Sequence, residues 1–401
     1  MKKILLLGGS RYILPIINAI HKLGYYAITC DYLPNNIAHK YSDEYHNISI
    51  IEKDEVLALA KNLKIDGILS FACDPGVETA AYVAEKLGLP TNPYQSVKIL
   101  QNKSKFREFL SKNGFNVPKA KGYTDIDMAF EDLKLFQFPI IVKPVDSAGS
   151  KGVTRVDDKE MFKKAAEYAI SYSKTNSFIV EEFIQQKGYS SDTDCFSING
   201  KLVFASFNNQ LFDSEADNPY TPSAYSWPSN MTENIQSELR SELQRLIDLL
   251  HLNTYIYNVE TRQSIDGKPY IMEFSPRGGG NRLAEILTMA TDSDLIMNTV
   301  RAAVGDKIQG IESDPKYNGY WAEVILHSDK NGRFCKLDIS EDLNKYIIEK
   351  DLWIKEGDEV HKFTGANETI GTLVFKFNSK EELNNYIPNI RDYIEVKVND
   401  N

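Results

Sequence analysis

The sequence has few cysteines, few histidines and no long apolar segment. Its four cysteines lie far apart in 401 residues with no C-x-x-C pair, and its six histidines form no H-x-x-x-H pattern. These spacings argue against a zinc centre and a disulfide scaffold, so we expect reduced, buried thiols and a cytoplasmic protein. No apolar run approaches the roughly 20 residues that cross a bilayer, so we expect no membrane partner.

Positive charge is also scarce, because the formal net charge is −10. An acidic chain lacks the electrostatic footprint of a nucleic-acid-binding protein, and we expect no nucleic-acid partner. The chain is 42% hydrophobic and 25% charged, values that are ordinary for a globular protein with sizeable cores. Its length favours two or three domains of about 150 residues each.

The first ninety residues alternate between strand and helix patterns. Apolar runs predict strands at 4–7, 26–30 and 67–71, and helical periodicity predicts helices at 15–23, 54–63 and 78–87. Strands separated by helices predict a parallel sheet, and the turn-rich segment 89–93 ends this domain, which we place at 1–93. The turn at 8–11 lacks the third glycine of a dinucleotide-binding fingerprint. It is either a simple strand–helix turn or a helix N-terminus that holds an anionic substrate.

The remaining chain mixes strands and helices without internal repeats. Strands are predicted at 138–142, 178–183, 195–198, 202–207, 255–261, 269–274 and 320–327, and helices at 103–112, 157–173, 232–250 and within 282–304. Asn199-Gly200 predicts a hairpin turn. The segment 212–230 is rich in Pro, Asp, Ser and Tyr, and we expect a long functional loop there.

Two glutamates on neighbouring predicted strands form the strongest candidate site. Glu260 and Glu273 flank the Asp266-Gly267 turn, and a hairpin would bring both carboxylates to one face. Paired carboxylates suit Mg²⁺ or Mn²⁺ rather than zinc. Arg277 and the run Gly278-Gly279-Gly280-Asn281-Arg282 follow, where glycines permit close approach and an arginine can stabilise phosphoryl oxygens. The alternative is a pair of solvent-facing strand residues beside an ordinary turn.

Lys143 ends an apolar strand and is followed by the small-residue turn 147–152. A lysine in that place needs an anionic partner, and the amides of such a turn can fold over phosphates, although a solvated loop is an equal alternative. Glu181 and Glu182 close another apolar strand and could accept from an adenine amine. A strand that runs into a charged turn is the simpler interpretation of that pair.

The order of these motifs resembles the ATP-grasp superfamily, in the group that includes biotin carboxylase and the purine-pathway ribonucleotide ligases. The resemblance covers about residues 1–305, from ILLLGG through LGLPTNP to VETRQSIDGKPYIMEFSPRGGGN, and YWAEVILH is similar to a strand of the biotin carboxylase branch. It implies an α/β chain with a parallel-sheet pre-ATP-grasp domain. A two-lobed α+β ATP-grasp domain at 94–305 (small lobe about 117–185) and a C-terminal α+β lobe at 306–401 would follow.

By that resemblance the chain binds ATP and Mg²⁺ or Mn²⁺ at defined positions. Lys103 and Lys143 would hold ATP phosphates, and Glu181, the Glu182 carbonyl and the Ile184 amide would contact the adenine. The implied mobile flap over the phosphates contains Ser147, Gly149, Ser150 and Gly152. Glu260 and Glu273 would bind the metal, while Arg277 and Lys143 would act on the transferring phosphoryl group. The implied substrate contacts are Arg11, Asp74, Glu78, Asn281 and Arg282.

The sequence departs from the family pattern at two places. Ser275 stands where the family usually has a metal-binding asparagine, so Ser275 is predicted as a weak metal ligand, with Asn281 as a substitute. The glutamate that often holds the ribose is absent from KGYSSDTD. Ser190, Asp192 and Asp194 are the alternatives for that role, and Asp192 is the choice among the predicted nucleotide contacts.

The resemblance implies a carboxylate–amine ligase that forms an amide through an acyl phosphate and releases ADP and phosphate. Its partners would be a small carboxylate and an amine, and a homodimer is compatible with the resemblance. Two alternatives stay open at this point. One is a bicarbonate-activating carboxylase of the biotin type, and the other is a catalytically inactive nucleotide-binding regulatory protein, which Ser275 and the altered ribose segment favour.

Overall fold

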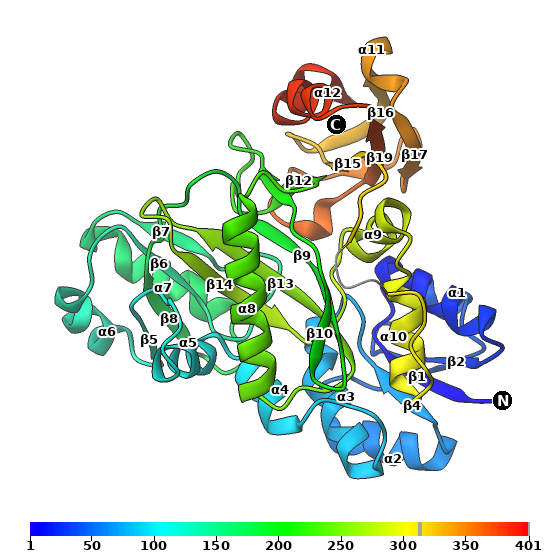
Figure 1. The fold of residues 1–401 in the computed structure, drawn as a ribbon. Helices are drawn as coiled ribbons and strands as arrows, with labels where there is room; N and C mark the ends of the chain where they lie inside the picture. Colours follow the sequence, from blue (N-terminus) through cyan, green and yellow to red (C-terminus); the bar gives the residue numbers. More distant parts are fainter. Residues whose placement is uncertain (312–314, 400–401) are drawn as a thin grey trace.

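A computed structural model describes residues 1–311 and 315–399 of the chain. Figure 1 shows an N-terminal α/β region in blue, a central region in cyan and green, and a C-terminal region in orange and red. The yellow helices α9 (Leu283–Thr291) and α10 (Leu295–Ala303) lie between these regions. Within the described residues, no helix combines the length and the apolar character that a membrane crossing requires.

The N-terminal region contains a four-stranded parallel sheet of order β3-β2-β1-β4. Its elements are β1 (Lys3–Leu7), α1 (Leu14–Lys22), β2 (Tyr26–Cys30), β3 (Glu44–His46), α2 (Lys53–Leu63), β4 (Gly67–Leu69) and α3 (Asp74–Leu87). Leu5 and Leu7 pack in one core with α2 and α3, whereas Ile4 and Leu6 pack in another with α1 and α10. Because both faces are covered, β1 is an unbroken apolar run rather than an alternating one.

Helices α4 (Tyr94–Leu100) and α5 (Lys103–Lys112) lead into the small lobe, an antiparallel sheet of order β5-β8-β6-β7. Its elements are β5 (Ala120–Tyr123), α6 (Ile126–Asp132), β6 (Ile140–Pro144), β7 (Thr154–Val156), α7 (Phe162–Ser171) and β8 (Phe178–Glu182). Val142 and Val180 belong to the core under α7. Lys143 and Glu181 follow these two residues on β6 and β8, and the alternation of side chains places them on the opposite face of the sheet.

A second antiparallel sheet, of order β10-β9-β13-β14, carries the predicted carboxylate pair. Its elements are β9 (Ser191–Ile198), β10 (Lys201–Ala205), α8 (Glu233–Leu249), β13 (Tyr255–Gln263) and β14 (Pro269–Ser275). Leu239, Leu243 and Leu246 of α8 recur at helical spacing and are fully buried. They pack in one core with Phe274 and Val259, and this packing fixes the sheet beneath the site.

The C-terminal region contains a five-stranded sheet of order β11-β12-β15-β19-β17 and a three-stranded sheet of order β18-β16-β20. Their strands are β11 (Asn209–Phe212), β12 (Pro222–Trp227), β15 (Tyr320–Leu326), β16 (Gly332–Ile339), β17 (Ile347–Leu352), β18 (Glu359–Val360), β19 (Gly371–Phe377) and β20 (Ile394–Asn399). The short helices α11 (Glu341–Asn344) and α12 (Lys380–Tyr386) complete it.

The segment 212–230 corrects one prediction, because it contains a central strand instead of an irregular loop. β12 pairs with β11 and with β15, and Tyr225 and Trp227 are fully buried. The local sequence concealed this strand because its proline and serines have low β-propensity. Its partner β15 lies a hundred residues further along the chain, so tertiary pairing rather than local pattern stabilises it.

The predicted fold class is confirmed: a parallel N-terminal sheet is followed by antiparallel sheets with helices on their faces. The elements that were not predicted include strands β3, β5, β7 and β11 and helices α4 and α6, and each of these is short. The domain boundaries at 93/94 and 305/306 stay predictions.

Candidate active site

The two predicted metal-binding glutamates lie side by side. Glu260 on β13 and Glu273 on β14 are direct partners across the antiparallel pair, and a register shift follows immediately after Glu260. Directly opposed residues of such a pair project from the same face with Cβ atoms about 5 Å apart. The Glu260 carboxylate accepts from Nη2 of Arg262 at 2.7 Å. The hairpin therefore presents two neighbouring carboxylates, as the sequence predicts.

Lys103 joins this hairpin to the predicted flap. Its Nζ lies 3.0 Å from Oε1 of Glu273 and donates to the carbonyl oxygen of Ser147 at 2.9 Å. Burial works against the charged form, but the attraction of Glu273 prevails and the pKa of Lys103 rises above its ordinary value. Lys103 begins α5, where Asn102 caps the helix by accepting from the amide of Lys105. A capped helix start thus holds a charged amine at the centre of the site.

A second buried ion cluster lies in the small lobe. Oε1 of Glu181 contacts Nζ of Lys143 at 2.5 Å, and Oε2 accepts from Nε of Arg107 at 2.9 Å. Arg107 also donates to the carbonyl oxygen of Met272 on β14 at 2.7 Å. Burial lowers the pKa of Lys143, while Glu181 opposes that shift.

The adenine contact of the Glu181 carboxylate stays a prediction, and in this structure the carboxylate is paired with two cations. Both of its oxygens already accept from cations, because Arg107, one helical turn after Lys103, reaches the same buried face. We expect Glu181 to position Lys143. The two residues predicted to contact adenine through their backbone are Glu182, the last residue of β8, and Ile184, two residues later. There the Glu182 side chain accepts from the amide of Gln137 at 2.9 Å, which fixes the strand end.

Replacing Glu181 by Gln would leave two buried cations without their carboxylate. We expect the free energy of unfolding to fall by about 3–5 kcal/mol, measured by urea denaturation at pH 7. Burial opposes ionisation, but Arg107 and Lys143 hold the pKa of Glu181 down at about 2, against an ordinary value of 4.5.

Because the folded pKa is depressed, this stabilisation is complete above about pH 4.5 and is lost as the pH falls toward 2. The difference between wild type and Glu181→Gln should shrink within that window. Glu108→Gln, which affects an exposed pair with Lys112, is the matched control and should stay near wild type. A wild-type-to-variant difference that did not change with pH would contradict the assignment.

Arg277 connects the site to the N-terminal region. Its Nη2 and Nε lie 2.8 and 2.9 Å from the two carboxylate oxygens of Asp74, at the start of α3. Burial opposes ionisation of Asp74, but Arg277 prevails and lowers the pKa of that carboxyl. The structure thus brings together two residues that the sequence predicts separately, as a phosphoryl contact and as a substrate contact.

Ser275, predicted as a weak metal ligand, is hydrogen-bonded to two other side chains in this structure, and its metal role stays a prediction. Its hydroxyl donates to Oδ1 of Asp74 at 3.1 Å and accepts from Nε2 of Gln101 at 2.9 Å. These bonds direct the side chain to α3 and α4 and leave the metal pair to the two glutamates. Glu78, one turn after Asp74, contacts Nζ of Lys53 at 3.2 Å and the Tyr94 hydroxyl at 2.8 Å. The structure does not bring Glu78 to the cluster, so its predicted substrate contact is unsupported.

Asp192 and Asp194 lie on β9, the strand that pairs with the Glu260 strand β13. Asp192 is opposite Glu260 in the sheet and accepts from Asn258 Nδ2 at 2.8 Å and from the Tyr225 hydroxyl at 3.2 Å. Burial and the charge of Glu260 raise the pKa of Asp192 to about 7. Burial raises the pKa of Asp194 to about 7, and its Oδ1 accepts from the amide of Gly279 at 2.8 Å. These contacts place Asp192 beside Glu260, and its predicted ribose role stays a prediction.

The glycine run packs closely against neighbouring side chains, while its predicted close approach to a ligand stays a prediction. A Cβ atom on Gly278 would lie 2.2 Å from the Phe71 ring, and one on Gly279 would lie 2.8 Å from Nδ2 of Asn258. Neither neighbour can move easily, because Phe71 is buried in a core and Asn258 is bonded to Asp192. A side chain at either position would push the loop away from Asp194, which accepts from the Gly279 amide.

The predicted flap, residues 147–152, is fastened to the C-terminal region. Gly149, Ser150 and Gly152 have positive φ angles of 70°, 57° and 72°. The Ser150 hydroxyl donates to the carbonyl oxygen of Tyr220 at 2.8 Å. Asn218 Nδ2 donates both to the carbonyl oxygen of Ser150 at 3.3 Å and to that of Thr364 at 3.1 Å. One amide group thus joins the flap to the C-terminal region.

Replacing Asn218 by Ala should loosen the flap. Three hydrogen bonds of the Asn218 side chain are removed, of which one, to the Ser150 carbonyl, restrains the flap directly. At about 1 kcal/mol for that bond, we expect trypsin to cleave after Lys151 roughly five times faster. The cleavage rate would be followed by mass spectrometry, with Asn385→Ala on the exposed face of α12 as the control. An unchanged rate at Lys151 would show that Asn218 does not restrain the flap.

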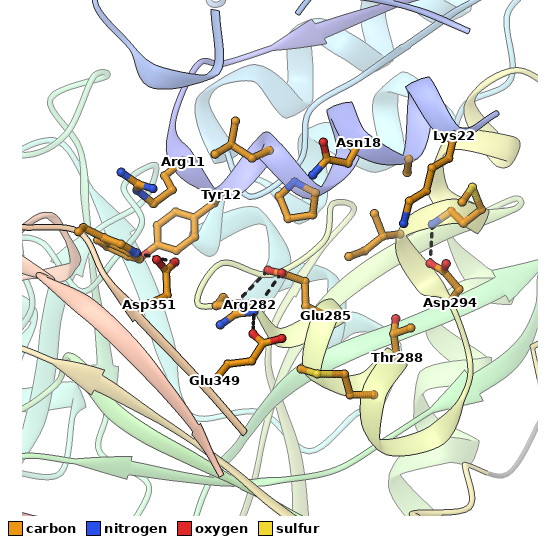
Figure 2. Close-up of a pocket in the computed structure, with 17 residues that line it drawn as sticks. Arg11, Tyr12, Asn18, Lys22, Arg282, Glu285, Thr288, Asp294, Glu349 and Asp351 are labelled. Carbon is orange, nitrogen blue, oxygen red and sulfur yellow. Dashed lines mark hydrogen bonds and ion pairs between the residues drawn. The ribbon is translucent and has the colours of Figure 1, made fainter. Parts of the chain in front are cut away.

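The remaining predicted substrate residues gather around a cavity of about 440 Å³, which lies between α1, α9 and the end of β17 (Figure 2). Arg11 lies over the Trp353 ring with its guanidinium carbon 5.3 Å from the centroid. Arg282 contacts Glu285 and Glu349. Asn281 accepts from the Tyr12 hydroxyl at 3.3 Å and donates to that of Tyr225 at 3.4 Å.

Sequence reasoning missed Arg107, Asn258 and Tyr225. The spacing of Arg107 from Lys103 and Leu110 was an available signal, because positions i, i+4 and i+7 share one helix face. A cation on a face that also carries a buried leucine needs a buried anion. Asn258 and Tyr225 gave no local signal, because their roles arise from strand pairing.

Comparison with known proteins identifies this arrangement. Residues 136–285 match the ATP-grasp domain family. The chain is 26% identical over 296 residues to the formate-dependent phosphoribosylglycinamide formyltransferase of Prochlorococcus marinus, covering 72% of this chain and 73% of that protein. It is 22% identical over 302 residues to the carbamoyl phosphate synthase large chain of Clostridium botulinum, covering 74% of this chain but 27% of the relative. The chain thus spans about a quarter of the length of that larger relative.

The fold extends the likeness to nearly the whole chain. The L-amino acid ligase of Bacillus licheniformis superposes with a TM-score of 0.83 at 20% identity, covering 100% of this chain and 99% of the other. The paired strand glutamates, the two lysines and the fastened flap lie in or beside the matched segment. Residues 136–285 thus match the ATP-grasp domain family by sequence, and nearly the whole chain is similar in fold to the amino acid ligase.

Proposed function

We propose that the protein is an ATP-dependent ligase that joins a small carboxylate to an amine and releases ADP and phosphate. The observation that carries this proposal is the convergence of Lys103, Lys143 and Arg277 on the Glu260–Glu273 hairpin within an ATP-grasp domain. The similar proteins named above include an amino acid ligase and a ribonucleotide formyltransferase. The names of both proteins are compatible with a reaction that activates a carboxylate.

The cations of the site suit a triphosphate. Lys103 and Lys143 both attract Glu273, and each amine is paired with a carboxylate. Phosphate oxygens from ATP would take over these pairings, while the amides of residues 147–152 would cover them. Arg277 would face the transferring phosphoryl group, held in place by Asp74.

A divalent cation fits the carboxylate pair. Glu260 and Glu273 offer only oxygen atoms, the donor type that Mg²⁺ and Mn²⁺ prefer, and both now lie against cationic side chains. When bound, such an ion would neutralise charge on the phosphates. Ser275 would not belong to the set, because its hydroxyl is bonded to Asp74 and Gln101.

The chemistry then requires alignment rather than a protein nucleophile. A carboxylate oxygen of the acid attacks the γ-phosphorus, and ADP leaves with the bridging oxygen. The amine nitrogen attacks the resulting acyl phosphate, loses a proton, and expels phosphate. The chain contributes positive charge around the moving phosphoryl group and excludes water under the flap. A homodimer is the proposed assembly.

Turnover with an acid and an amine should yield ADP and phosphate in equal amounts, measured by coupled ADP release and mass spectrometry of the products. Glu273→Gln should lower the rate about 100-fold or more, because it removes charge balance for the metal and for Lys103. Glu341→Gln, on exposed α11, is the control. Stoichiometric AMP would overturn the proposal, and a bicarbonate-only arm with and without biotin would expose a carboxylase instead.

Ser275→Ala tests the composition of the metal site. We expect Mn²⁺ affinity, followed by electron paramagnetic resonance in the presence of ADP, to be unchanged by Ser275→Ala. Glu273→Gln should weaken it strongly, because a ligand is lost. A comparable loss of affinity in both variants would mean that the hydroxyl leaves Asp74 to bind the metal.

A further inference from the structure

The cavity in Figure 2 lies beside the ATP site but is separate from it. Its lining comes from α1, α9, the α9–α10 junction and the C-terminal region, and it includes none of the predicted phosphate or metal ligands. A smaller adjoining hollow shares Tyr12, Arg282 and Glu285 with it and reaches Gly279. The amide of Gly279 bonds to Asp194 on the floor of the site. The cavity is therefore separated from the Gly279 loop by a hollow of only about 10 Å³.

The inner wall of the cavity carries more negative than positive charge. Arg282 lies 3.3 Å from Oε1 of Glu285 and also contacts Glu349. Behind it, Glu323 on β15 is completely buried, and neither of its carboxylate oxygens has a hydrogen-bond partner among the described residues. Arg282 thus contacts two carboxylates, while its Nη1 has no hydrogen-bond partner among the described residues. The whole lining carries four carboxylates and three cations: Glu285, Asp294, Glu349 and Asp351 against Arg11, Lys22 and Arg282. Burial raises the pKa of both Glu285 and Glu323, as expected where positive charge is insufficient.

Aromatic rings complete this wall. Tyr12 and Trp353 meet edge to face with centroids 5.8 Å apart. The Trp353 ring already accepts one cation, Arg11, and its indole nitrogen donates to Asp351 at 2.8 Å. Carboxylates beside an indole face form a recognition site for organic ammonium groups. The other cation of the lining, Lys22, is labelled near Asp294, away from the carboxylates that Arg282 contacts (Figure 2).

We propose that this cavity binds the non-reacting ammonium group of the amine substrate, which is therefore a diamine or a basic amino acid. The inference rests on the proposed ligase function. An ammonium group held by Glu285 and Glu349 is outside the phosphate-binding cluster, so the nitrogen that attacks the acyl phosphate must be a second amine of the same molecule. The adjoining hollow toward Gly279 gives the direction in which that amine extends.

Calorimetric titration of the nucleotide-free protein tests this with four probes: cadaverine, L-lysine, L-norleucine and L-glutamate. We expect cadaverine or L-lysine to bind, and L-norleucine, which lacks the side-chain amine, to bind at least about tenfold more weakly. The tighter of the two binders identifies a diamine or an amino acid. Equal binding of L-norleucine, tighter binding of the anionic L-glutamate, or no binding of either cation would overturn the proposal.

Glu349→Gln removes one carboxylate from the wall and should weaken the bound cation about tenfold or more. The Glu349 side chain is 43% exposed, so the variant should fold, which its melting temperature would verify. Glu341→Gln is the control and should bind as wild type does. Unchanged affinity in Glu349→Gln would overturn the assignment of this wall.

The ADP-release assay separates the two proposals. If acids and neutral amines support ADP release while no cation binds the cavity, the ligase function stands and the cavity assignment fails. If cadaverine or L-lysine binds with the expected sensitivity to Glu349→Gln but no acid supports ADP release, the proposed function fails while the cation site stands.

Discussion

The ion pair between Lys103 and Glu273 holds the site together. It joins the first turn of α5 to the central hairpin, and the same amine also binds the backbone of the flap at Ser147. Glu273 in turn lies opposite Glu260 and within the field of Lys143. A capped helix, a hairpin and a glycine turn thus meet at one amine, in an ion pair whose Glu273 side chain is 42% exposed. Breaking it would separate the flap from the carboxylates it covers.

When no ligand is bound, each cation of the site needs a carboxylate partner from the protein itself. Lys143 and Arg107 share Glu181, Lys103 faces Glu273, and Arg277 holds Asp74. Isolated buried charges would cost several kcal/mol each, so the network is a condition for folding as much as for binding. A triphosphate entering the site would exchange one set of anions for another and would not have to meet bare cations. This explains why groups predicted as nucleotide contacts are found paired.

The sequence predicted what depends on neighbouring residues and missed what depends on distant ones. The parallel N-terminal sheet, the hairpin around Asp266-Gly267 and the glutamate pair follow from local periodicity and turn residues. The hydrogen bonding of Ser275 does not follow from local sequence, because its hydroxyl donates to Asp74, about two hundred residues earlier in the chain. Strand β12 was hidden for the same reason, since its partner β15 is remote in sequence. Glu181 was recognised as an acidic residue at a strand end, but its partner Arg107 comes from helix α5.

The two concave regions of the molecule differ in charge, and this difference separates their ligands. Around Lys103, Lys143 and Arg277 the carboxylates of Glu273, Glu181 and Asp74 are each paired with a cation, whereas Asp192 and Asp194 accept from neutral donors. A polyanion accompanied by a divalent cation preserves the balance of the paired groups. Around Arg282 the carboxyl groups outnumber the guanidinium, and burial has shifted the pKa of Glu285 and Glu323 upward to limit the repulsion. Adding an anion there would increase the imbalance, whereas an ammonium group would remove it. Because Asn281 and Arg282 follow Arg277 within five residues, one short loop sets both environments and holds the cationic end of a substrate beside its reacting partner.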